Sequence, residues 1–526
     1  MVANIGDYAT IYERFDRETP ERFNFGRDAV DGWDDGRPAM IWLGEGGEER
    51  RLTFGDFSRL SNRFANAMRN AGVGRGERVM VLLGKVPEWH AILTGLLKLG
   101  AIAIPCVPQL RSGDLKFRAE HSGSVAMISG PEGIGQVEKM RRDSPGLKHF
   151  ACVGEENEGW GSFEDLVDGA SEASDDGAFI LYTSGTTKNP KGVVHTHGYT
   201  HAKRVQARFW LDLQEGDRLW CTSGTSWAKS IWNVFLGPWS LGTEIFFHEG
   251  GFDPAERLDL IERHAITVLC QAPTEYRLLA KTPELEDANL SQLQHAVSDG
   301  EPLNPPVIQR WKELHGVMIY DGHGQTENTL IVGNFPGLEV RLGSMGKPSP
   351  GCEVKIIDLD GNGCPPDEPG DIALSGRIAP LFKEYWEQPD ETEAVFRDGY
   401  YLTGDRAYRD EDGYLWFVGR SDDVILSAGY RIGPFEVESV LIEHPAVVES
   451  AVVPSSDEDR GSVVKAYVVL GKDYEPSDGL AREIQDFCKA QTAPYKYPRR
   501  IEFISELPKT TSGKIRRVEL RQREMA

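Results

Sequence analysis

The stretch VMVLLGKVPEWHAILTGLLKLGAIAIP (79–105) decides the fold. Residues 79–84 form a short apolar run, which predicts a buried strand. Residues 86–100 have the apolar spacing and the length of a helix, and Gly100 is a suitable residue to end it. A second strand-like run begins at Ala101. The order strand, helix, strand predicts a parallel sheet that is covered by helices.

The same alternation extends from about Glu77 to Tyr320. Further strand-like runs are VAMIS (125–129), AFILYTS (178–184), TEIFFH (243–248), ITVLC (266–270) and HAVSDG (295–300). The helical patterns between them include FDPAERLDLIERH (252–264) and NPPVIQRWKELHG (304–316). In folds of this class, ligands bind beyond the carboxyl ends of the strands. The glycine-rich segments that follow these strands are therefore candidate binding loops.

The pattern changes twice in the second half of the chain. From about Leu342 to Gly419, Gly, Pro and Asp separate short apolar runs, which predicts an antiparallel β region. After Arg420, helical and strand patterns return over about a hundred residues, which is enough for a small domain. We therefore predict an α/β protein with a large N-terminal domain at 1–421, made of parallel sheets covered by helices plus the β region, and a small α+β C-terminal domain at 422–526.

Composition and charge restrict the possible functions. The chain has 526 residues, more than the roughly 100–200 of a typical domain. Its 82 acidic and 58 basic side chains give a net charge of −24, which argues against sequence-independent binding to nucleic acid or to an anionic membrane. The seven cysteines contain no Cys-x-x-Cys pair, and neither a signal peptide nor a membrane span is evident. We expect a cytoplasmic protein.

A polar loop follows the predicted strand at 178–184. Its sequence is Tyr182-Thr-Ser-Gly-Thr-Thr-Lys-Asn-Pro-Lys-Gly192. Backbone N–H groups and hydroxyls on such a loop suit phosphate oxygens, and Lys188 and Lys191 supply counter-charges. The loop lacks the Gly-Lys-Ser/Thr ending of a Walker loop. From these residues alone, a solvated connection between a strand and a helix is an equal alternative.

Five further segments follow this loop in order. They are Gly300-Glu301-Pro302, Asp321-Gly-His-Gly-Gln-Thr-Glu327, Tyr401-Leu-Thr-Gly-Asp405, Gly419-Arg-Ser-Asp-Asp423 and Pro508-Lys-Thr-Thr-Ser-Gly-Lys514. Together with the loop, they resemble the motifs of the adenylate-forming (AMP-binding) superfamily, which includes acyl-CoA synthetases, luciferases and peptide-synthetase adenylation domains. The sequence departs from that pattern at Lys188, where the family usually has Gly, and at His323, where it commonly has an aromatic ring.

The resemblance implies an ATP site, a catalytic set and a hinge. The implied ATP- and AMP-binding residues are Thr183, Ser184, Gly185, Thr186, Thr187, Lys191, Gly300, Glu301, Pro302, Asp321, Gly322, His323, Gly324, Gln325, Thr326, Asp405, Arg420 and Lys514. Lys514, Thr187 and Glu327 would be catalytic, and Glu327 would also bind Mg²⁺. The small C-terminal domain would be a mobile lid that rotates about Asp422.

Several residues suit these implied roles chemically, and each has a plain alternative. Asp405 offers two acceptor oxygens to a pair of ribose hydroxyls, or it is a structural turn residue. Arg420 can bind ribose or phosphate oxygens, or it pairs with the acids that follow it. Glu327 is a hard oxygen ligand for Mg²⁺, or a solvated surface charge. Lys514 can stabilise the negative charge that builds when a carboxylate attacks the α-phosphorus, or it is one charge of a basic tail.

Three C-terminal segments, at 427–434, 461–467 and 493–498, look most like the medium-chain acyl-CoA synthetases. That likeness implies a CoA site formed by Gln109, Ala428, Gly429, Tyr430, Arg460, Tyr495, Lys496 and Tyr497. It also places Trp227 and Arg431 near the acyl substrate. Ordinary packing is an equal alternative for the two tyrosines of 493–498. The spacing of Trp232, Phe235 and Trp239 is typical of one helix face, so we expect the last two of them to pack in the core.

We therefore predict an ATP-dependent acyl-CoA synthetase. A carboxylate and ATP would give acyl-AMP and pyrophosphate, and CoA would then give acyl-CoA and AMP. An indole ring near the acyl group favours a short-chain, medium-chain or branched fatty acid. The alternatives are an aryl acid–CoA ligase, an adenylating enzyme whose acceptor is a carrier-protein thiol or oxygen, and a nucleotide-binding regulatory protein without turnover. A homo-oligomer is also compatible with the sequence.

Two other patterns imitate metal sites. His195, His197 and His201 have metal-like spacing, but no acid or cysteine pattern supports them, so we expect them to face solvent or to cap a helix. The sequence Asp358-Leu-Asp-Gly-Asn-Gly363 resembles the start of a calcium loop. Because Pro369 occupies the position that needs a carboxylate, we expect a β-turn there.

Overall fold

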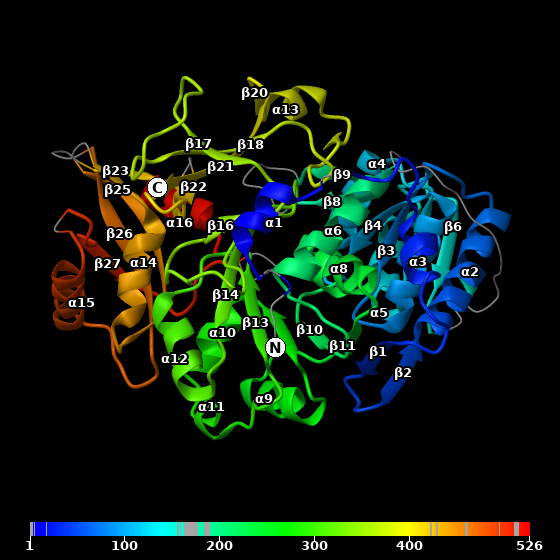
Figure 1. The fold of residues 1–526 in the computed structure, drawn as a ribbon, viewed down its shortest axis with the longest axis horizontal. Coiled ribbons are helices and arrows are strands. Elements are labelled where there is room, and N and C mark those ends of the chain that lie inside the picture. The colour runs from blue at the N-terminus through cyan, green and yellow to red at the C-terminus, as the bar shows by residue number, and fades with distance from the viewer. Residues whose placement is uncertain are drawn as a thin grey trace.

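The computed structural model shows an α/β fold with a separate C-terminal domain (Figure 1). The described residues are 4, 6–16, 18–154, 157, 159–162, 177–183, 190–420, 423–427, 430–457, 461–493, 495–509 and 515–525. Residues 161, 162, 431, 461 and 525 are described by their backbone only.

The larger of the two main sheets has nine strands within the described residues and is mostly parallel. Their spatial order is β16 (Lys347–Pro348), β15 (Leu330–Gly333), β14 (Ile319–Gly324), β13 (His295–Asp299), β12 (Val268–Gln271), β10 (Arg218–Cys221), β11 (Glu244–His248), β1 (Pro38–Leu43) and β2 (Glu49–Thr53). Neighbours from β14 to β1 run parallel, and antiparallel pairs occur only at the two edges of this described sheet. The strands predicted between 243 and 300 are thereby confirmed.

The second main sheet contains the stretch that decides the fold. Across the described residues its eight strands are ordered β19 (Glu384–Tyr385), β9 (Gly192–Thr196), β8 (Gly177–Tyr182), β4 (Ile102–Cys106), β3 (Arg78–Leu82), β5 (Ala126–Ser129), β6 (His149–Cys152) and β7 (Gly161–Ser162). The predicted strand–helix–strand unit is β3, α3 (Pro87–Leu99) and β4, with β3 and β4 parallel. Gly100 ends α3 in the left-handed conformation, with a φ of 73°.

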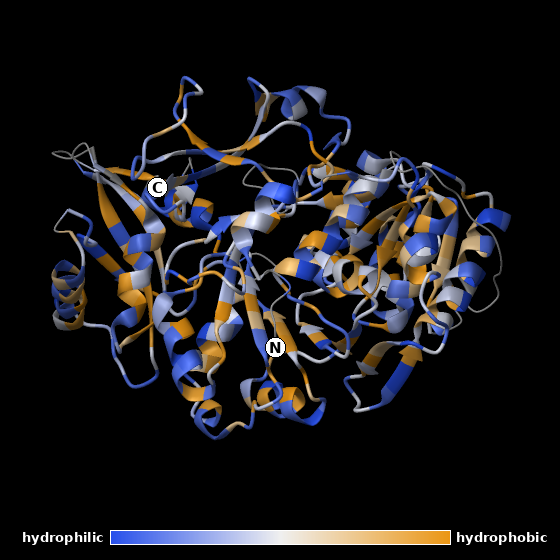
Figure 2. Ribbon diagram, in the orientation of Figure 1, coloured by the Kyte–Doolittle hydropathy of each residue, from blue (hydrophilic) through white to orange (hydrophobic). Residues whose placement is uncertain are grey.

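The helices cover these sheets and fill the space between them (Figure 1). The remaining helices are α1 (Tyr8–Arg14), η1 (Gly26–Val30), α2 (Phe54–Asn70), α4 (Ser112–Ser122), α5 (Pro131–Arg141), α6 (His197–Phe209), α7 (Ala228–Ser230), η3 (Ile231–Leu236), α8 (Gly237–Ser240), α9 (Pro254–Arg263), α10 (Pro273–Ala280), α11 (Glu284–Asp287), α12 (Pro305–His315), α13 (Pro389–Ala394), α14 (Pro434–Glu443), α15 (Asp478–Gln491) and α16 (Arg517–Met525). The largest hydrophobic cluster joins both sheets, for example Val81 of β3, Val268 of β12 and Trp239 of α8. Figure 2 shows hydrophobic residues concentrated in the strands.

The antiparallel β region predicted at 342–419 is confirmed. Its strands are β17 (Val354–Ile357), β18 (Gly370–Ser375), β21 (Tyr400–Arg409), β20 (Phe396–Arg397) and β22 (Leu415–Arg420), all paired antiparallel. Asp358 accepts hydrogen bonds from the backbone N–H groups of Asp360 and Asn362, which confirms the predicted turn.

The C-terminal domain has its own sheets and its own core. Its strands are β23 (Ile425–Ser427), β24 (Tyr430–Ile432), β25 (Val447–Asp457), β26 (Gly461–Leu470) and β27 (Arg500–Phe503). Each hydrophobic cluster in the described part of the chain lies wholly before Arg420 or wholly after it. Polar contacts cross between the domains, including Lys281 Nζ to the Val447 carbonyl (2.9 Å) and Asn304 Nδ2 to Ser439 Oγ (3.2 Å).

The predicted boundary at Ser421-Asp422 lies outside the described residues. None of the helices in the described part of the chain combines the length and the hydropathy that a membrane span needs.

Gly346 should be critical for stability. Its φ is 92°, and a Cβ atom there would lie 2.1 Å from the carbonyl oxygen of Gly333 on β15. Gly346→Ala should lower the free energy of unfolding by about 3 kcal/mol, because left-handed backbone strain and the close contact add. Gly413 has a φ of 86° with nothing within 4 Å of such a Cβ, so Gly413→Ala should cost about 1 kcal/mol. Equal losses for the two variants in urea unfolding would contradict the steric argument.

Candidate functional site

The predicted nucleotide segments meet at the carboxyl ends of adjacent parallel strands. β13 leads directly into Gly300-Glu301-Pro302, and β14 contains the first residues of the 321–327 motif. In the register of this pair, Ser298 lies beside Asp321 and Asp299 lies beside Gly322. Two segments that are about 20 residues apart in sequence are therefore neighbours in space, as expected for ligand-binding ends of a parallel sheet.

The carboxylate of Asp405 is the centre of the described site. Its side chain is only 7% exposed, and Gln325 donates a hydrogen bond from Nε2 to Oδ2 over 2.7 Å. Asp405 on β21 is in register with Arg420 on β22, whose guanidinium nitrogen lies 3.7 Å from Oδ1. His323 Nε2 lies 3.5 Å from Oδ2. Four residues from three of the predicted motifs are thus brought together, and Arg420 pairs with Asp405.

His323 forms one wall of this group. The centroid of its ring lies 6.1 Å from that of Phe417 on β22, and its side chain is 16% exposed. An imidazole in this position has an aromatic face for a planar ligand and a polar edge toward Asp405. His323 therefore keeps a flat aromatic face at this position and places a ring nitrogen 3.5 Å from the Asp405 carboxylate.

Gln325 is itself held by residues of the antiparallel region. Its Nε2 also donates to the Thr403 carbonyl over 2.7 Å, and the Tyr401 hydroxyl donates to its Oε1 over 3.0 Å. Tyr401 belongs to a quoted motif, but its bond to Gln325 has no signal in the sequence. The amide is fixed from both sides, which orients the Asp405 carboxylate.

Glu327, two residues after Gln325, belongs to a second polar group, which it forms with Tyr385 and Lys191. Its Oε1 accepts a hydrogen bond of 2.8 Å from the hydroxyl of Tyr385, a residue that the sequence analysis missed. Burial raises the pKa of Glu327, while Tyr385, Lys191 and Arg420 partly counteract that rise. A half-buried carboxylate with one oxygen oriented by a tyrosine suits a hard divalent cation, whose charge would counteract the rise in pKa.

Lys191 is close to Glu327. Its ammonium nitrogen lies 2.6 Å from Glu391 Oε2 and 4.6 Å from the centre of the Tyr385 ring. The backbone N–H of Thr183 donates to the Lys191 carbonyl over 3.0 Å, so the two ends of the polar loop are joined. Glu391 therefore balances the charge that was expected to face phosphate.

Several predicted residues lie outside the described part of the chain. They are Ser184, Gly185, Thr186, Thr187, Lys188, Asp422, Ala428, Gly429, Arg460 and Lys514. Arg431 is described by its backbone only.

Lys509 and Ile515, the nearest described residues on either side of Lys514, lead toward the nucleotide segments. Lys509 and Ile515 form an antiparallel bridge, and Arg517 makes hydrogen bonds of 2.7 and 2.8 Å to the two oxygens of Glu438. Burial alone would lower the pKa of Arg517, but Glu438 and, from the N-terminal domain, Glu301 raise it overall. The segment after Lys514 therefore approaches Glu301.

Among the described residues predicted to bind CoA, some are paired or stacked with neighbours and others are exposed. The rings of Tyr430 and Tyr495 stack at 4.1 Å, and Tyr430 remains 50% exposed. Lys496 pairs with Glu436, and Arg499 donates to the Tyr497 hydroxyl over 3.0 Å. Gln109 is exposed. The two tyrosines of 493–498 pack within the C-terminal domain, which was the alternative role given to them.

The acyl segment, which we define as residues 226–232 around Trp227, contributes one member of a charged pair that was not predicted from the sequence. Trp227 is half-buried directly before α7, and the ammonium of Lys229 on α7 pairs with the carboxylate of Asp299. Burial alone would lower the pKa of Lys229, but Asp299, Cys270 and Cys221 raise it overall, so the ammonium stays charged. Lys229 had no recognisable motif.

The neighbouring aromatic and imidazole side chains are in the core. Phe235 and Trp239 are buried, as predicted, and Trp232 is buried too. His195, His197 and His201 were expected to face solvent or to cap a helix. The first alternative was wrong, because all three are buried, and the side chain that caps α6 is that of Thr196. The His195 ring stacks on Tyr199 with centroids 3.7 Å apart. No group of three or more metal-ligating side chains occurs among the described residues.

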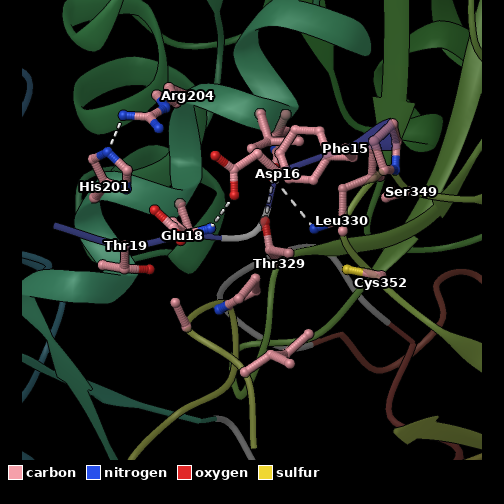
Figure 3. A pocket seen from close by; sticks show the side chains of 18 of the residues that line it. Phe15, Asp16, Glu18, Thr19, His201, Arg204, Thr329, Leu330, Ser349 and Cys352 are labelled. Carbon is pink, nitrogen blue, oxygen red and sulfur yellow. Dashed lines mark hydrogen bonds between the residues drawn. The ribbon is translucent and has the colours of Figure 1, made fainter. Parts of the chain in front are cut away.

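A cavity of about 280 Å³ lies beside the N-terminal segment, between α6 and residues 349–352 and 377–380 (Figure 3). Among its described lining residues, none was predicted to contact ATP, CoA or the acyl group. Gln206 forms part of its wall, where its Oε1 accepts hydrogen bonds from the Thr329 hydroxyl (3.0 Å) and the Leu330 N–H (3.3 Å).

Comparisons with known proteins agree with this fold and this motif order. The chain matches the models for the AMP-binding enzyme at residues 27–386 and for the AMP-binding enzyme C-terminal domain at residues 436–514. The Mus musculus protein named acyl-coenzyme A synthetase ACSM3, mitochondrial, is 44% identical over 99% of this chain and 94% of its own length. The uncharacterized acyl–CoA ligase YtcI of Bacillus subtilis (strain 168) is 44% identical over 93% of each chain.

The crystal structure of the anthranilate CoA ligase AuaEII in complex with anthranoyl-AMP is also similar. It has a TM-score of 0.89 and 33% identity, and the match covers 96% of this chain and 98% of that chain. The chain therefore belongs to the AMP-binding enzyme family, which confirms the predicted fold class.

Asp321 should make stability depend on pH. Burial raises the pKa of its carboxyl from 3.8 to about 8, so between these values the folded protein keeps a proton that the unfolded chain releases. Stability should therefore fall as pH rises through this window. Asp321→Asn cannot ionise and should flatten that fall, gaining about 2 kcal/mol relative to the original protein between pH 6 and 8.5 in urea unfolding. The exposed control Asp473→Asn should leave the slope unchanged, and an equally steep Asp321→Asn profile would contradict the assignment.

Proposed function

We propose that this member of the AMP-binding enzyme family is an AMP-forming acyl-CoA synthetase. A carboxylate and ATP give acyl-AMP and pyrophosphate, and CoA then gives acyl-CoA and AMP. The observation that carries this proposal is the buried Asp405 carboxylate, which Gln325 orients between His323 and Arg420. The likeness to proteins named as acyl-CoA synthetases or CoA ligases extends over 93% or more of the chain.

The Asp405 group suits the nucleoside part of ATP. Its carboxylate can accept both ribose hydroxyls, and the guanidinium of Arg420 can contact ribose or phosphate oxygens. The ring of His323 and the segment Gly300-Glu301-Pro302 would border the adenine. The loop from Thr183 to Lys191 would hold the phosphates with backbone N–H groups, hydroxyls and the Lys191 charge.

Glu327 would hold Mg²⁺ together with the phosphates. The ion would neutralise part of the charge of the triphosphate. Tyr385 orients one oxygen of Glu327 for this role. Because Lys191 is paired with Glu391, a bound phosphate would compete with Glu391 for its ammonium.

Lys514 would act when the carboxylate attacks the α-phosphorus. Two anions approach one another in that step, and a positioned ammonium stabilises the charge that develops on the equatorial oxygens. The position of Arg517, three residues later, beside Glu438 and Glu301 supports an approach of this segment to the site. Rotation about Asp422 would then exchange Lys514 for the CoA-binding residues Ala428, Gly429, Tyr430, Arg460 and Tyr495–Tyr497 with Gln109.

The acid is a fatty acid of short or medium length, a branched one, or an aryl acid. Trp227 and Arg431 would contact it or its adenylate. The aryl alternative is favoured by the similarity to AuaEII, which was crystallised with anthranoyl-AMP. An acceptor on a carrier protein or an oxygen acceptor would give the same first step and a different second one.

Product analysis tests this function directly. The purified protein with ATP and Mg²⁺ should release pyrophosphate only when a carboxylic acid is present, and added CoA should yield equal amounts of AMP and thioester. Asp405→Ala should lower kcat/KM for ATP by about 10²-fold or more, because a buried ligand group is lost. Release of pyrophosphate without thioester would favour another acceptor. No carboxylate-dependent release with any acid would contradict the synthetase.

Lys514→Ala separates the two half-reactions. Adenylation should slow by about 10²–10³-fold, because one preorganised donor to the transition state is lost. Thioester formation from supplied acyl-AMP and CoA should stay within about threefold of the original rate. Lys472→Ala, at an exposed lysine of the same domain, is the control and should leave both rates unchanged. Equal slowing of both half-reactions would contradict the proposed division of roles.

A further inference from the structure

The Lys229–Asp299 pair lies on the sheet face that the acyl segment covers. Asp299 is in register with Gly322, and Val297 with Cys270, so these four positions lie on one face of the nine-stranded sheet. Asn233 of η3 donates from Nδ2 to Cys270 Sγ over 3.5 Å on that face. The segment that continues from Trp227 through α7 into η3 therefore packs over the end of β13.

The pair is partly accessible at the end of this face. Gly300, directly after Asp299, is exposed, and Trp227 and Lys229 are half-buried. Beside Asp299, the space at Gly322 is filled by core side chains, because a Cβ atom there would lie 2.4 Å from Leu330 Cδ1 and 2.8 Å from Trp210 Cζ2. A substrate group bound at Trp227 would therefore approach the charged pair from the side of Gly300.

A second Lys–Asp pair in the same domain shows what a purely structural pair looks like. The side chain of Lys98 is 2% exposed, and its ammonium bonds both Asp31 (2.6 Å) and Asn62 (2.8 Å). The side chain of Lys229 is 14% exposed, and its acceptors among the described residues are two atoms of Asp299. An ammonium has three N–H donors, so Lys229 has one more to offer to a ligand.

We propose that the Lys229–Asp299 pair recognises a hydroxyl group on the acyl part of the carboxylic acid. This inference rests on the proposed function and narrows its substrate class to hydroxy acids. A hydroxyl can accept from the Lys229 ammonium and donate to the Asp299 carboxylate at once. The pair carries no net charge, so it favours a neutral polar group over a second carboxylate or an amine cation.

A plain hydrocarbon chain fits this surface poorly. It would remove water from an ion pair without replacing the lost hydrogen bonds. Sites built around such polar groups reject analogues that lack the matching hydroxyl far more strongly than apolar pockets reject an extra one. The indole of Trp227 alone therefore does not determine which acids bind, because the polar pair beside it also selects among them.

Matched pairs of acids test the proposal. The pairs are butyrate and 4-hydroxybutyrate, hexanoate and 6-hydroxyhexanoate, and benzoate and 4-hydroxybenzoate, each assayed as thioester formation with ATP and CoA. For at least one pair the enzyme should prefer the hydroxy acid by about tenfold or more in kcat/KM. The double variant Lys229→Met/Asp299→Ala, which leaves neither charge alone, should lose that preference and gain activity with the plain acid.

The Lys98→Met/Asp31→Asn double variant is the matched control. It removes a Lys–Asp pair elsewhere in the domain, in which the lysine is buried, and it should leave the ratio between the two acids of each pair unchanged, whatever its effect on stability. Turnover of plain acids without any preference for the hydroxy forms would overturn this inference and leave the synthetase function intact. A preference that survives in the Lys229/Asp299 variant would also overturn it. Absence of thioester with every acid would overturn both proposals.

Discussion

The buried carboxylate of Asp405 is the constraint on which the site geometry depends. A charge with so little exposure must be met by donors, since leaving it unpaired in the interior would be costly. Those donors come from the turn after β14 and from β22, so one carboxylate ties the end of the parallel sheet to the antiparallel region. Any rearrangement that separated these two regions would also take Gln325 and His323 away from Asp405.

A strongly acidic protein can bind anionic ligands only where basic groups are concentrated. Here Lys191, Arg420 and Arg517 are all near the candidate site, and each is balanced by a carboxylate from another segment. Bound phosphate would replace some of these internal partners rather than meet bare cations. Each of these three described cations is thus paired locally, which limits the repulsion among them.

The sequence was sufficient for the elements and for the order of the binding segments. β3 and β4 are recognisable because a strand that is buried on both faces needs a continuous apolar run. The end of α3 is recognisable because the left-handed residue that ends a helix is usually glycine. Pairings between distant side chains have no such local signal. Tyr385 bonds Glu327 across 58 residues, and Lys191 bonds Glu391 across 200. The buried histidines were misjudged for the same reason, since only packing against the fold decides whether an imidazole is enclosed.

The separation of the hydrophobic clusters at Arg420 has a thermodynamic consequence. The C-terminal domain has hydrophobic clusters of its own, so the proposed rotation would not have to expose them to water. The hydrogen bonds at Lys281 and Asn304 can be exchanged for bonds to solvent at a small net cost. In the proposed rotation, a bound ligand could therefore select among placements of this domain without paying for the exposure of its core.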